Sequence, residues 1–84
     1  MQGKGIEMDE VIEILEELKP GVDYETNEEL VSKRVLDSLT ILALVAELED
    51  AFDITIPAVE IVEPNFNSAA AIWSLVERLM DEDD

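Results

Sequence analysis

The serine of the tetrapeptide LDSL, Ser38, is the side chain of this sequence that is best placed to take part in chemistry. A serine becomes a nucleophile only when a neighbouring base removes its proton. The sequence contains no histidine. Of the two cations that precede the tetrapeptide, Arg34 cannot act as a base and Lys33 would need deep burial to do so. Ser38 is therefore expected to be either a helix-start residue or a residue that another enzyme modifies.

The residues that other common kinds of active site require are missing. Zinc sites need histidine or cysteine, EF-hands need a D-x-D-x-D-G loop, and phosphate loops need a run of glycines, and the sequence has none of these. Paired carboxylates need a cleft that separates their pKa values. A chain of 84 residues has little room for an enclosed substrate cavity. The sequence therefore predicts a protein that is not an enzyme and has no metal site.

The charge of the chain restricts its partners. Acidic residues outnumber basic residues by 22 to 5, so the formal net charge is 5 − 22 = −17. Nucleic acid is excluded as a partner, because proteins bind its phosphate backbone through lysine and arginine, and this chain has only five of them. An anionic membrane surface is disfavoured as well, because it would repel the acids. Proteins with basic patches are the expected partners. With no cysteine, no signal-peptide hydrophobic core and no apolar run long enough to span a membrane, the chain is expected to be cytoplasmic and not membrane-inserted.

Three segments with apolar residues at helical spacing predict the main helices. The first, residues 8–19, ends at Pro20-Gly21, because this pair stops a helix. The second runs from Ser38 to about Phe52, and the carboxylate of Asp37 can cap its first free N–H groups. The third is NSAAAIWSLVERLM, with Asn67 as the predicted N-cap.

The segments between these helices are expected to be irregular. Residues 20–36 are predicted to form a long loop with a short helical turn at residues 28–31. Five apolar side chains are expected to anchor this loop: Tyr24, Leu30, Val31, Val35 and Leu36. Ile54 and Ile56 alternate as in a strand but have no second strand to pair with, so an extended connector is predicted. One more helical turn is predicted at residues 58–62, with Pro64 ending it.

These elements predict an all-α fold. It is a small four-helix bundle of three main helices and one short helix, with a long loop between helices 1 and 2. Residues 9–80 are expected to form one domain, with residues 1–8 as a flexible leader and residues 81–84 as an acidic, frayed tail. A monomer is expected.

The predicted helix of residues 38–52 has two different faces. One apolar stripe is expected to face the core: Ile41, Leu44, Val45, Leu48 and Phe52. The opposite face is expected to expose a small apolar patch with acids at its rim: Leu39, Ala43, Ala46, Glu47 and Asp50. In the last helix, the predicted core residues are Ile72, Trp73, Leu75, Val76 and Leu79.

With these features the sequence resembles the acyl carrier proteins of the phosphopantetheine-binding family over about residues 9–80. LDSL resembles the family's attachment motif, and the helix that follows it leads to Asp53 and then to Ile56-Pro57, as in the family. The resemblance implies a phosphopantetheine arm on Ser38, with Asp37 beside it. It also implies that the exposed face of the 38–52 helix meets partner enzymes. These are a phosphopantetheinyl transferase, an adenylating acyl or aminoacyl ligase and a downstream acyltransferase.

Within the family, the sequence is most similar to the D-alanyl carrier type. The pattern IP-x-x-E that ends at Glu60 and the run Asn65-Phe66-Asn67-Ser68 resemble that subgroup, and Thr40 and Ala43 stand where fatty-acid carriers have acids. The run Ser32-Lys33-Arg34-Val35 departs from the family, which has an acidic or glycine-containing turn there. The resemblance implies a thioester-bound cargo, with D-alanine as the leading candidate.

Two alternatives stay open on sequence alone. The chain could instead carry fatty-acid or polyketide intermediates, or it could be an acidic helical module that binds proteins without being modified. Ser38 separates the carrier functions from the module, because a carrier requires its hydroxyl and an unmodified module does not.

Overall fold

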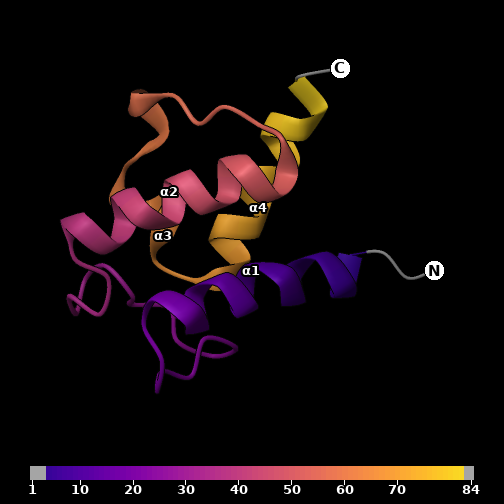
Figure 1. The fold of residues 1–84 in the computed structure, drawn as a ribbon. Helices are drawn as coiled ribbons and strands as arrows, with labels where there is room; N and C mark the ends of the chain where they lie inside the picture. The colour runs from indigo at the N-terminus through magenta and orange to yellow at the C-terminus, as the bar shows by residue number, and fades with distance from the viewer. Residues whose placement is uncertain (1–3, 83–84) are drawn as a thin grey trace.

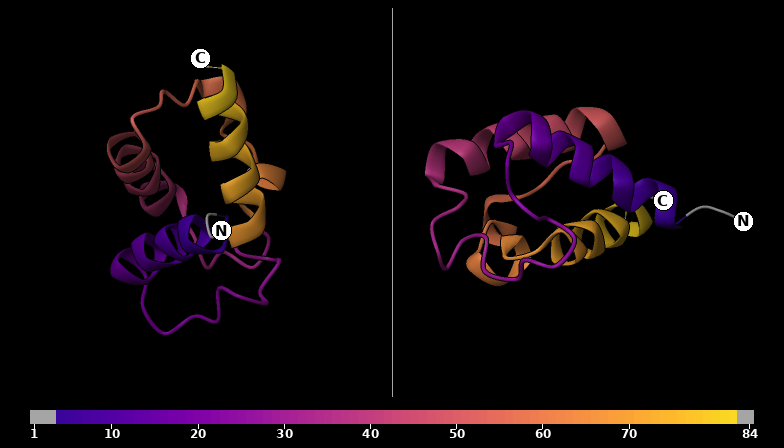
Figure 2. Two further views of the ribbon diagram at one scale, coloured as in Figure 1. Left: turned by 90° about the vertical axis from the view of Figure 1, so that its right-hand side faces the viewer. Right: turned by 90° about the horizontal axis from the view of Figure 1, so that it is seen from below.

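The computed structural model describes the backbone of residues 4–82 and the side chains of residues 8–81. Within that range the elements are α1 (Lys4–Leu18), α2 (Ser38–Phe52), η1 (Ala58–Glu60, a 3₁₀ turn), α3 (Glu63–Phe66) and α4 (Ala69–Glu82). Helices α1 and α2 run antiparallel, and α4 crosses behind both of them (Figure 1). Figure 2 shows from two further directions that α4 lies on one side of the α1–α2 pair. The predicted all-α bundle of three main helices and one short helix is confirmed.

The helices meet around an apolar core. Among the described side chains, no polar or charged one is buried. The largest fully buried side chains come from α1, α2, α3, α4 and the first loop: Phe66, Leu15, Leu30, Leu36, Leu44, Leu48, Ile72, Leu75, Val11 and Val76. Phe52 at the end of α2 packs against Trp73 of α4, with ring centroids 5.8 Å apart. Because each fully buried side chain of this kind contributes about 1.5–3 kcal/mol, the core holds the three long helices together.

Both terminal helices are longer than the sequence analysis predicts. Helix α1 begins at Lys4 instead of Met8, so residues 4–8 of the predicted flexible leader are helical. Gly5 is tolerated there, because a single glycine costs only about 1 kcal/mol and a nucleated helix extends easily. Helix α4 continues through Asp81 to Glu82, two residues into the predicted tail. Residues 1–3 of the leader and 83–84 of the tail lie outside the described residues.

The connector after α2 follows the prediction in part. Asp53 ends α2 in the left-handed conformation (φ 55°), and Ile54 and Ile56 are buried without forming a strand. The predicted turn at residues 58–62 is the shorter η1. The prediction that Pro64 ends it is wrong, because Pro64 lies in the first turn of α3. Proline fits that position, since its fixed φ suits a helix and its missing N–H has no partner to lose.

The N-cap of α4 is Ser68, and the prediction of Asn67 is wrong. The Ser68 hydroxyl accepts a hydrogen bond from the N–H of Ala71 at 3.0 Å, which is the N-cap geometry. Asn67 has helical backbone angles (φ −77°, ψ −12°), whereas an N-cap residue is extended. The Asn67 side chain turns instead towards the loop before α2.

That loop, residues 19–37, packs on the core as expected. Tyr24, Leu30 and Leu36 are buried, and Val31 and Val35 are half-buried. The predicted helical turn at residues 28–31 is displaced. The N–H of Lys33 donates to the carbonyl oxygen of Glu29 at 2.9 Å, but the turn does not continue into a helix. The loop therefore reaches Ser38 through irregular backbone that is held by buried side chains and by individual hydrogen bonds.

Candidate functional site

Ser38 is the first residue of α2, and its position is set by the residue before it. Asp37 has extended backbone angles, and its Oδ1 accepts a hydrogen bond from the N–H of Thr40 at 2.8 Å. The carbonyl oxygen of Asp37 accepts the first helical hydrogen bond, from the N–H of Ile41 at 2.9 Å. The Ser38 side chain is exposed, and its hydroxyl makes no hydrogen bond within the part of the chain that the structure describes. This geometry presents a free hydroxyl at the start of a rigid helix.

Asp37 is held in its charged form. The hydrogen bond from the Thr40 N–H, with a further one from the Thr40 side chain, lowers the pKa of the Asp37 carboxyl below its ordinary value. A carboxylate with a lowered pKa is a weak base, and this one is already engaged as a helix cap. Asp37 therefore orients Ser38 but is poorly suited to remove its proton.

A hollow of about 330 Å³ opens beside Ser38. The side chains that line it come from the loop, α2, the connector and α3: Val31, Ser38, Ile41, Leu42, Ile61, Val62, Glu63 and Phe66. Most of them are apolar, and several at the rim are exposed. The sequence analysis does not predict this hollow, because four separate segments build it and none carries a signal for it alone.

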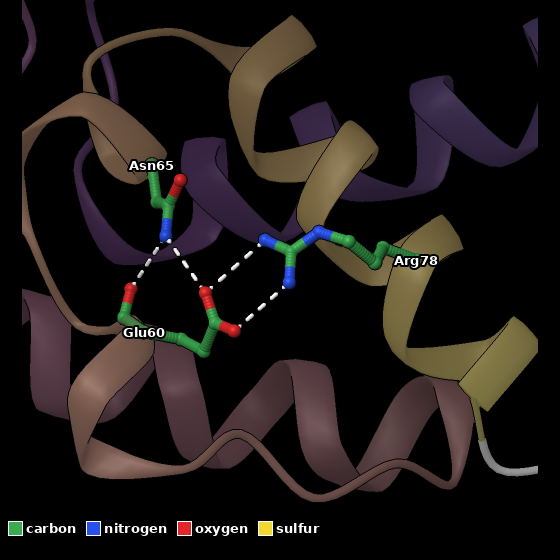
Figure 3. A network of polar contacts seen from close by, with 3 residues as sticks. All are labelled: Glu60, Asn65 and Arg78. Carbon is green, nitrogen blue, oxygen red and sulfur yellow. Dashed lines mark hydrogen bonds and ion pairs between the residues drawn. The ribbon is translucent and has the colours of Figure 1, made fainter.

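The connector wall of the hollow is fastened to α4 by a polar network (Figure 3). The guanidinium of Arg78 donates to both carboxylate oxygens of Glu60, at 2.8 and 3.1 Å. The Asn65 side chain donates to the carbonyl oxygen of Glu60 at 2.8 Å. The bond from Arg78 is the main cause that lowers the pKa of the Glu60 carboxyl. Ile61 and Val62, which line the hollow, lie between Glu60 and Asn65 in sequence, so the network sets the position of this wall.

The outer face of α2 is exposed as the sequence analysis predicts. Leu39 is 78% exposed. The other four residues of the predicted face are exposed as well: Ala43, Ala46, Glu47 and Asp50. The prediction omits Leu42, which is 59% exposed and lies one turn from Leu39. Leu42 stands three residues after Leu39, and this spacing, which puts two residues on the same face of a helix, could have predicted its exposure. Val59 and Val62 are also exposed, on the connector.

The two cations before Ser38 face solvent. Lys33 and Arg34 are exposed, and neither forms an ion pair with another described residue. Arg34 has a φ of 60°, which a non-glycine residue seldom adopts. Two cations therefore stand five and four positions before Ser38, whereas the acids of α2 begin nine positions after it, at Glu47.

No group of three or more metal-ligating side chains lies together in residues 8–81. The whole sequence lacks histidine and cysteine. None of the described helices has the length and apolarity that crossing a bilayer requires.

Comparison with known proteins identifies the family. The family described as "Phosphopantetheine attachment site" matches residues 9–72, which is more than half of the chain. The chain belongs to this family. A D-alanyl carrier protein of Streptococcus sanguinis is 42% identical over 71 residues, covering 83% of this chain and 90% of the relative. One of Streptococcus gordonii is 41% identical over the same shares. One of Lactobacillus delbrueckii subsp. bulgaricus is 30% identical over 76 residues, covering 88% and 94%.

The carrier therefore bears a covalently attached phosphopantetheine group, as predicted. The residues at the start of α2 fit such a group. Ser38 offers a free hydroxyl, and the first N–H groups of a helix favour the anionic phosphodiester that attachment creates. When attached, the group supplies a thiol, which the chain itself lacks because it has no cysteine.

Proposed function

We propose that Ser38 is the attachment residue and that the chain is a non-catalytic carrier of an acyl or aminoacyl group, with D-alanine as its cargo. The observation that carries the proposal is the free, exposed hydroxyl of Ser38 at the start of α2. The proposal further places the carrier in the cytoplasm as a monomer.

The other serines of the matched segment are poor candidates. Residues 9–72 contain three serines. The Ser32 hydroxyl donates to a carboxylate oxygen of Glu63 at 2.7 Å, and the Ser68 hydroxyl caps α4. Modifying either would break a contact that holds an element in place. Only the Ser38 hydroxyl of these three is without such a role in the described structure, which supports its assignment.

The proposed attachment needs a partner enzyme. The Ser38 oxygen forms a bond to the β-phosphorus of coenzyme A, the pyrophosphate bond breaks, and adenosine 3′,5′-bisphosphate leaves. A base of a phosphopantetheinyl transferase takes the hydroxyl proton, because Asp37, the acid beside Ser38, is committed to capping α2. The transferase also supplies Mg²⁺. The chain contributes the position of the hydroxyl and the surface that the transferase binds.

The outer face of α2 is the proposed docking surface. Leu39 and Leu42 supply apolar contact next to Ser38, and Glu47 and Asp50 supply negative charge further along. A transferase, an adenylating ligase and a downstream acyltransferase would each bind there through basic residues, because opposite charges steer the encounter.

The proposed cargo, D-alanine, rests on the relatives and on local sequence. All three relatives named above are D-alanyl carrier proteins. Of the residues that resemble this subgroup, Asn65 is structural here because its side chain donates to Glu60, whereas Thr40 meets Asp37 through its backbone N–H. Both residues belong to elements beside Ser38, α2 and α3, where a ligase would bind. A partner ligase, and not the bundle itself, would therefore select the cargo.

The assignment of Ser38 is tested by intact mass. Incubation of the full chain with coenzyme A, Mg²⁺ and a broad-range phosphopantetheinyl transferase is expected to add one phosphopantetheine group. Ser38→Ala is expected to gain none while keeping its helical circular dichroism, and Ser74→Ala, an exposed serine of α4, is the matched control that should gain one. An adduct on the Ser38→Ala protein would refute the assignment.

The modified protein then tests the cargo. With a D-alanine-activating ligase and ATP, we expect hydroxylamine-labile labelling by D-alanine in preference to L-alanine. Efficient charging by a malonyl transferase, without D-alanine loading, would instead make the chain a fatty-acid or polyketide carrier.

A further inference from the structure

Asn67 ties the loop before Ser38 to the junction of α3 and α4. Its side-chain oxygen accepts hydrogen bonds from the N–H groups of Val31 at 2.8 Å and Ser32 at 3.0 Å. Its backbone carbonyl oxygen accepts a third from the N–H of Leu30 at 2.9 Å. One residue therefore holds three consecutive N–H groups of a segment that lies more than 30 positions away in sequence.

A second layer of contacts fixes the Asn67 carboxamide itself. Its NH₂ group donates to the Ser32 hydroxyl oxygen at 3.1 Å and to a Glu63 carboxylate oxygen at 3.4 Å. The Ser32 hydroxyl donates to the same Glu63 oxygen at 2.7 Å. The carboxamide is thus oriented by both partners, and its oxygen can point only at the loop.

The contacts of Asn67 are linked to Ser38 through residues 30–36, whose two ends are joined by a backbone hydrogen bond. The N–H of Leu36 donates to the carbonyl oxygen of Leu30 at 2.8 Å, and both side chains are buried. Asp37 and Ser38 follow Leu36 directly. Holding Leu30 therefore also holds the end of the loop from which α2 starts. Val31 and Glu63, which Asn67 binds, line the hollow beside Ser38.

We propose that Asn67 is a positioning residue for the modification of Ser38: its carboxamide, together with its backbone carbonyl oxygen, holds residues 30–32 in the one arrangement that presents the hydroxyl. This inference rests on the proposed function. The reason is thermodynamic. A loop without regular secondary structure keeps one conformation only through contacts such as these. A partner that binds only that conformation has its intrinsic affinity multiplied by the fraction of the chain that adopts it.

Losing the carboxamide should therefore affect binding more than chemistry. In Asn67→Ala the N–H groups of Val31 and Ser32 lose their acceptor. We expect the KM of the transferase for the carrier to rise about five- to tenfold, because the competent conformation becomes a minority. The kcat should stay within about twofold, since the hydroxyl and the transferase residues are unchanged.

Two variants separate positioning from general stability. Asn67→Asp combined with Glu63→Gln keeps an oxygen where Val31 and Ser32 donate and lets the new Gln amide donate to the new carboxylate, so it should restore the KM to within about threefold of the wild type. Ser68→Ala removes the N-cap hydrogen bond of α4 at the next residue, which lowers stability without touching the loop, so its KM should match the wild type. Amide hydrogen exchange at residues 30–32 and 36 should quicken in Asn67→Ala alone.

The results decide the proposal in either direction. An unchanged KM for Asn67→Ala, or an equal rise for Ser68→Ala, would overturn it. If the wild type gains no adduct, or if Ser38→Ala gains one, the proposed function fails instead. In that case the exchange measurement still decides whether Asn67 holds the loop.

Discussion

At the scale of single residues, the role of a serine depends more on the hydrogen-bond partners of its hydroxyl than on its chemical type. Ser32, Ser38 and Ser68 carry the same hydroxyl. Ser32 and Ser68 use it to hold a loop and a helix end, while that of Ser38 faces solvent. Asp37 makes this possible, because it caps α2 and so leaves the serine that follows without a structural task.

The lowered pKa of Asp37 predicts a pH-dependent contribution to stability. A carboxyl whose pKa is lowered by folding stabilises the fold above its unfolded pKa of about 3.9, and loses that contribution as pH falls through the lower folded pKa. Asp37→Asn keeps a capping oxygen without the charge. We expect its Tm to lie modestly below that of the wild type at pH 7, because the cap keeps an oxygen and loses only its charge.

This difference in Tm should shrink to nothing as the pH is lowered below about 4. Thermal unfolding of the two proteins between pH 2 and pH 7 measures it. Both proteins share every other acid, so the titration of those acids is common to the two curves, and high salt reduces the repulsion between Asp37 and the other acids. Parallel curves across the whole range would contradict the role of the charge.

At the scale of elements, short irregular segments shape the surroundings of Ser38. The connector that includes η1 and α3 forms one wall of the hollow, and it has little helix of its own. A bidentate Arg78–Glu60 pair fastens it to α4, and the Asn65 side chain ties α3 to η1 (Figure 3). Bidentate pairs fix geometry as well as distance. The helices thus supply stability, and the polar contacts decide where the connector lies.

Weakening this network should loosen the connector without unfolding the bundle. In Glu60→Gln the charge is lost and Arg78 can donate to one oxygen only. We expect amide exchange at Ile61 and Asn65 to quicken by roughly three- to tenfold, in line with the modest strength of exposed pairs. Exchange in the core of α1 should not change.

Arg78→Lys is the companion variant, because it keeps the positive charge but loses the bidentate geometry. An intermediate effect on the same two amides is expected. If Glu60→Gln left their exchange rates at the wild-type values, the network would not be what holds the connector.

At the scale of the whole molecule, the negative charge is distributed along the chain, whereas the proposed attachment site is a single residue, Ser38. The radius of gyration is 11.8 Å, close to the roughly 12 Å that a folded chain of this length should have. A net charge of −17 on so small a body attracts any basic protein. Selecting a particular partner therefore depends on where the acids lie relative to Ser38, on the outer face of α2.

Charge reversal on two faces tests this. Glu47→Lys with Asp50→Lys changes the net charge from −17 to −17 + 4 = −13, and we expect modification of Ser38 to slow by about three- to tenfold. Glu13→Lys with Glu17→Lys on the exposed face of α1 makes the same change in net charge and should slow it by less than twofold. Added salt should slow the wild type as well.

Equal effects of the two pairs of substitutions would mean that total charge, and not the α2 face, governs docking. Circular dichroism of both double variants checks that the helices persist.

The sequence by itself determined the features that depend on local periodicity and local hydrogen bonds. It predicts the three long helices, the buried stripe of α2, its exposed face and the Asp37 cap, because each arises within one or two turns of chain. The placement of Ser38 at the head of α2 follows from these.

Tertiary structure alone decided what distant segments build together. The hollow is lined by four separate segments, and Arg78 binds Glu60 at a separation of 18 positions. Asn67 does not cap α4; its side chain instead accepts hydrogen bonds from loop residues 35 and 36 positions away. A capping serine stands next to Asn67, so local pattern cannot tell which of the two caps the helix. Only packing of the loop against α3 brings N–H groups to the Asn67 carboxamide and settles its role.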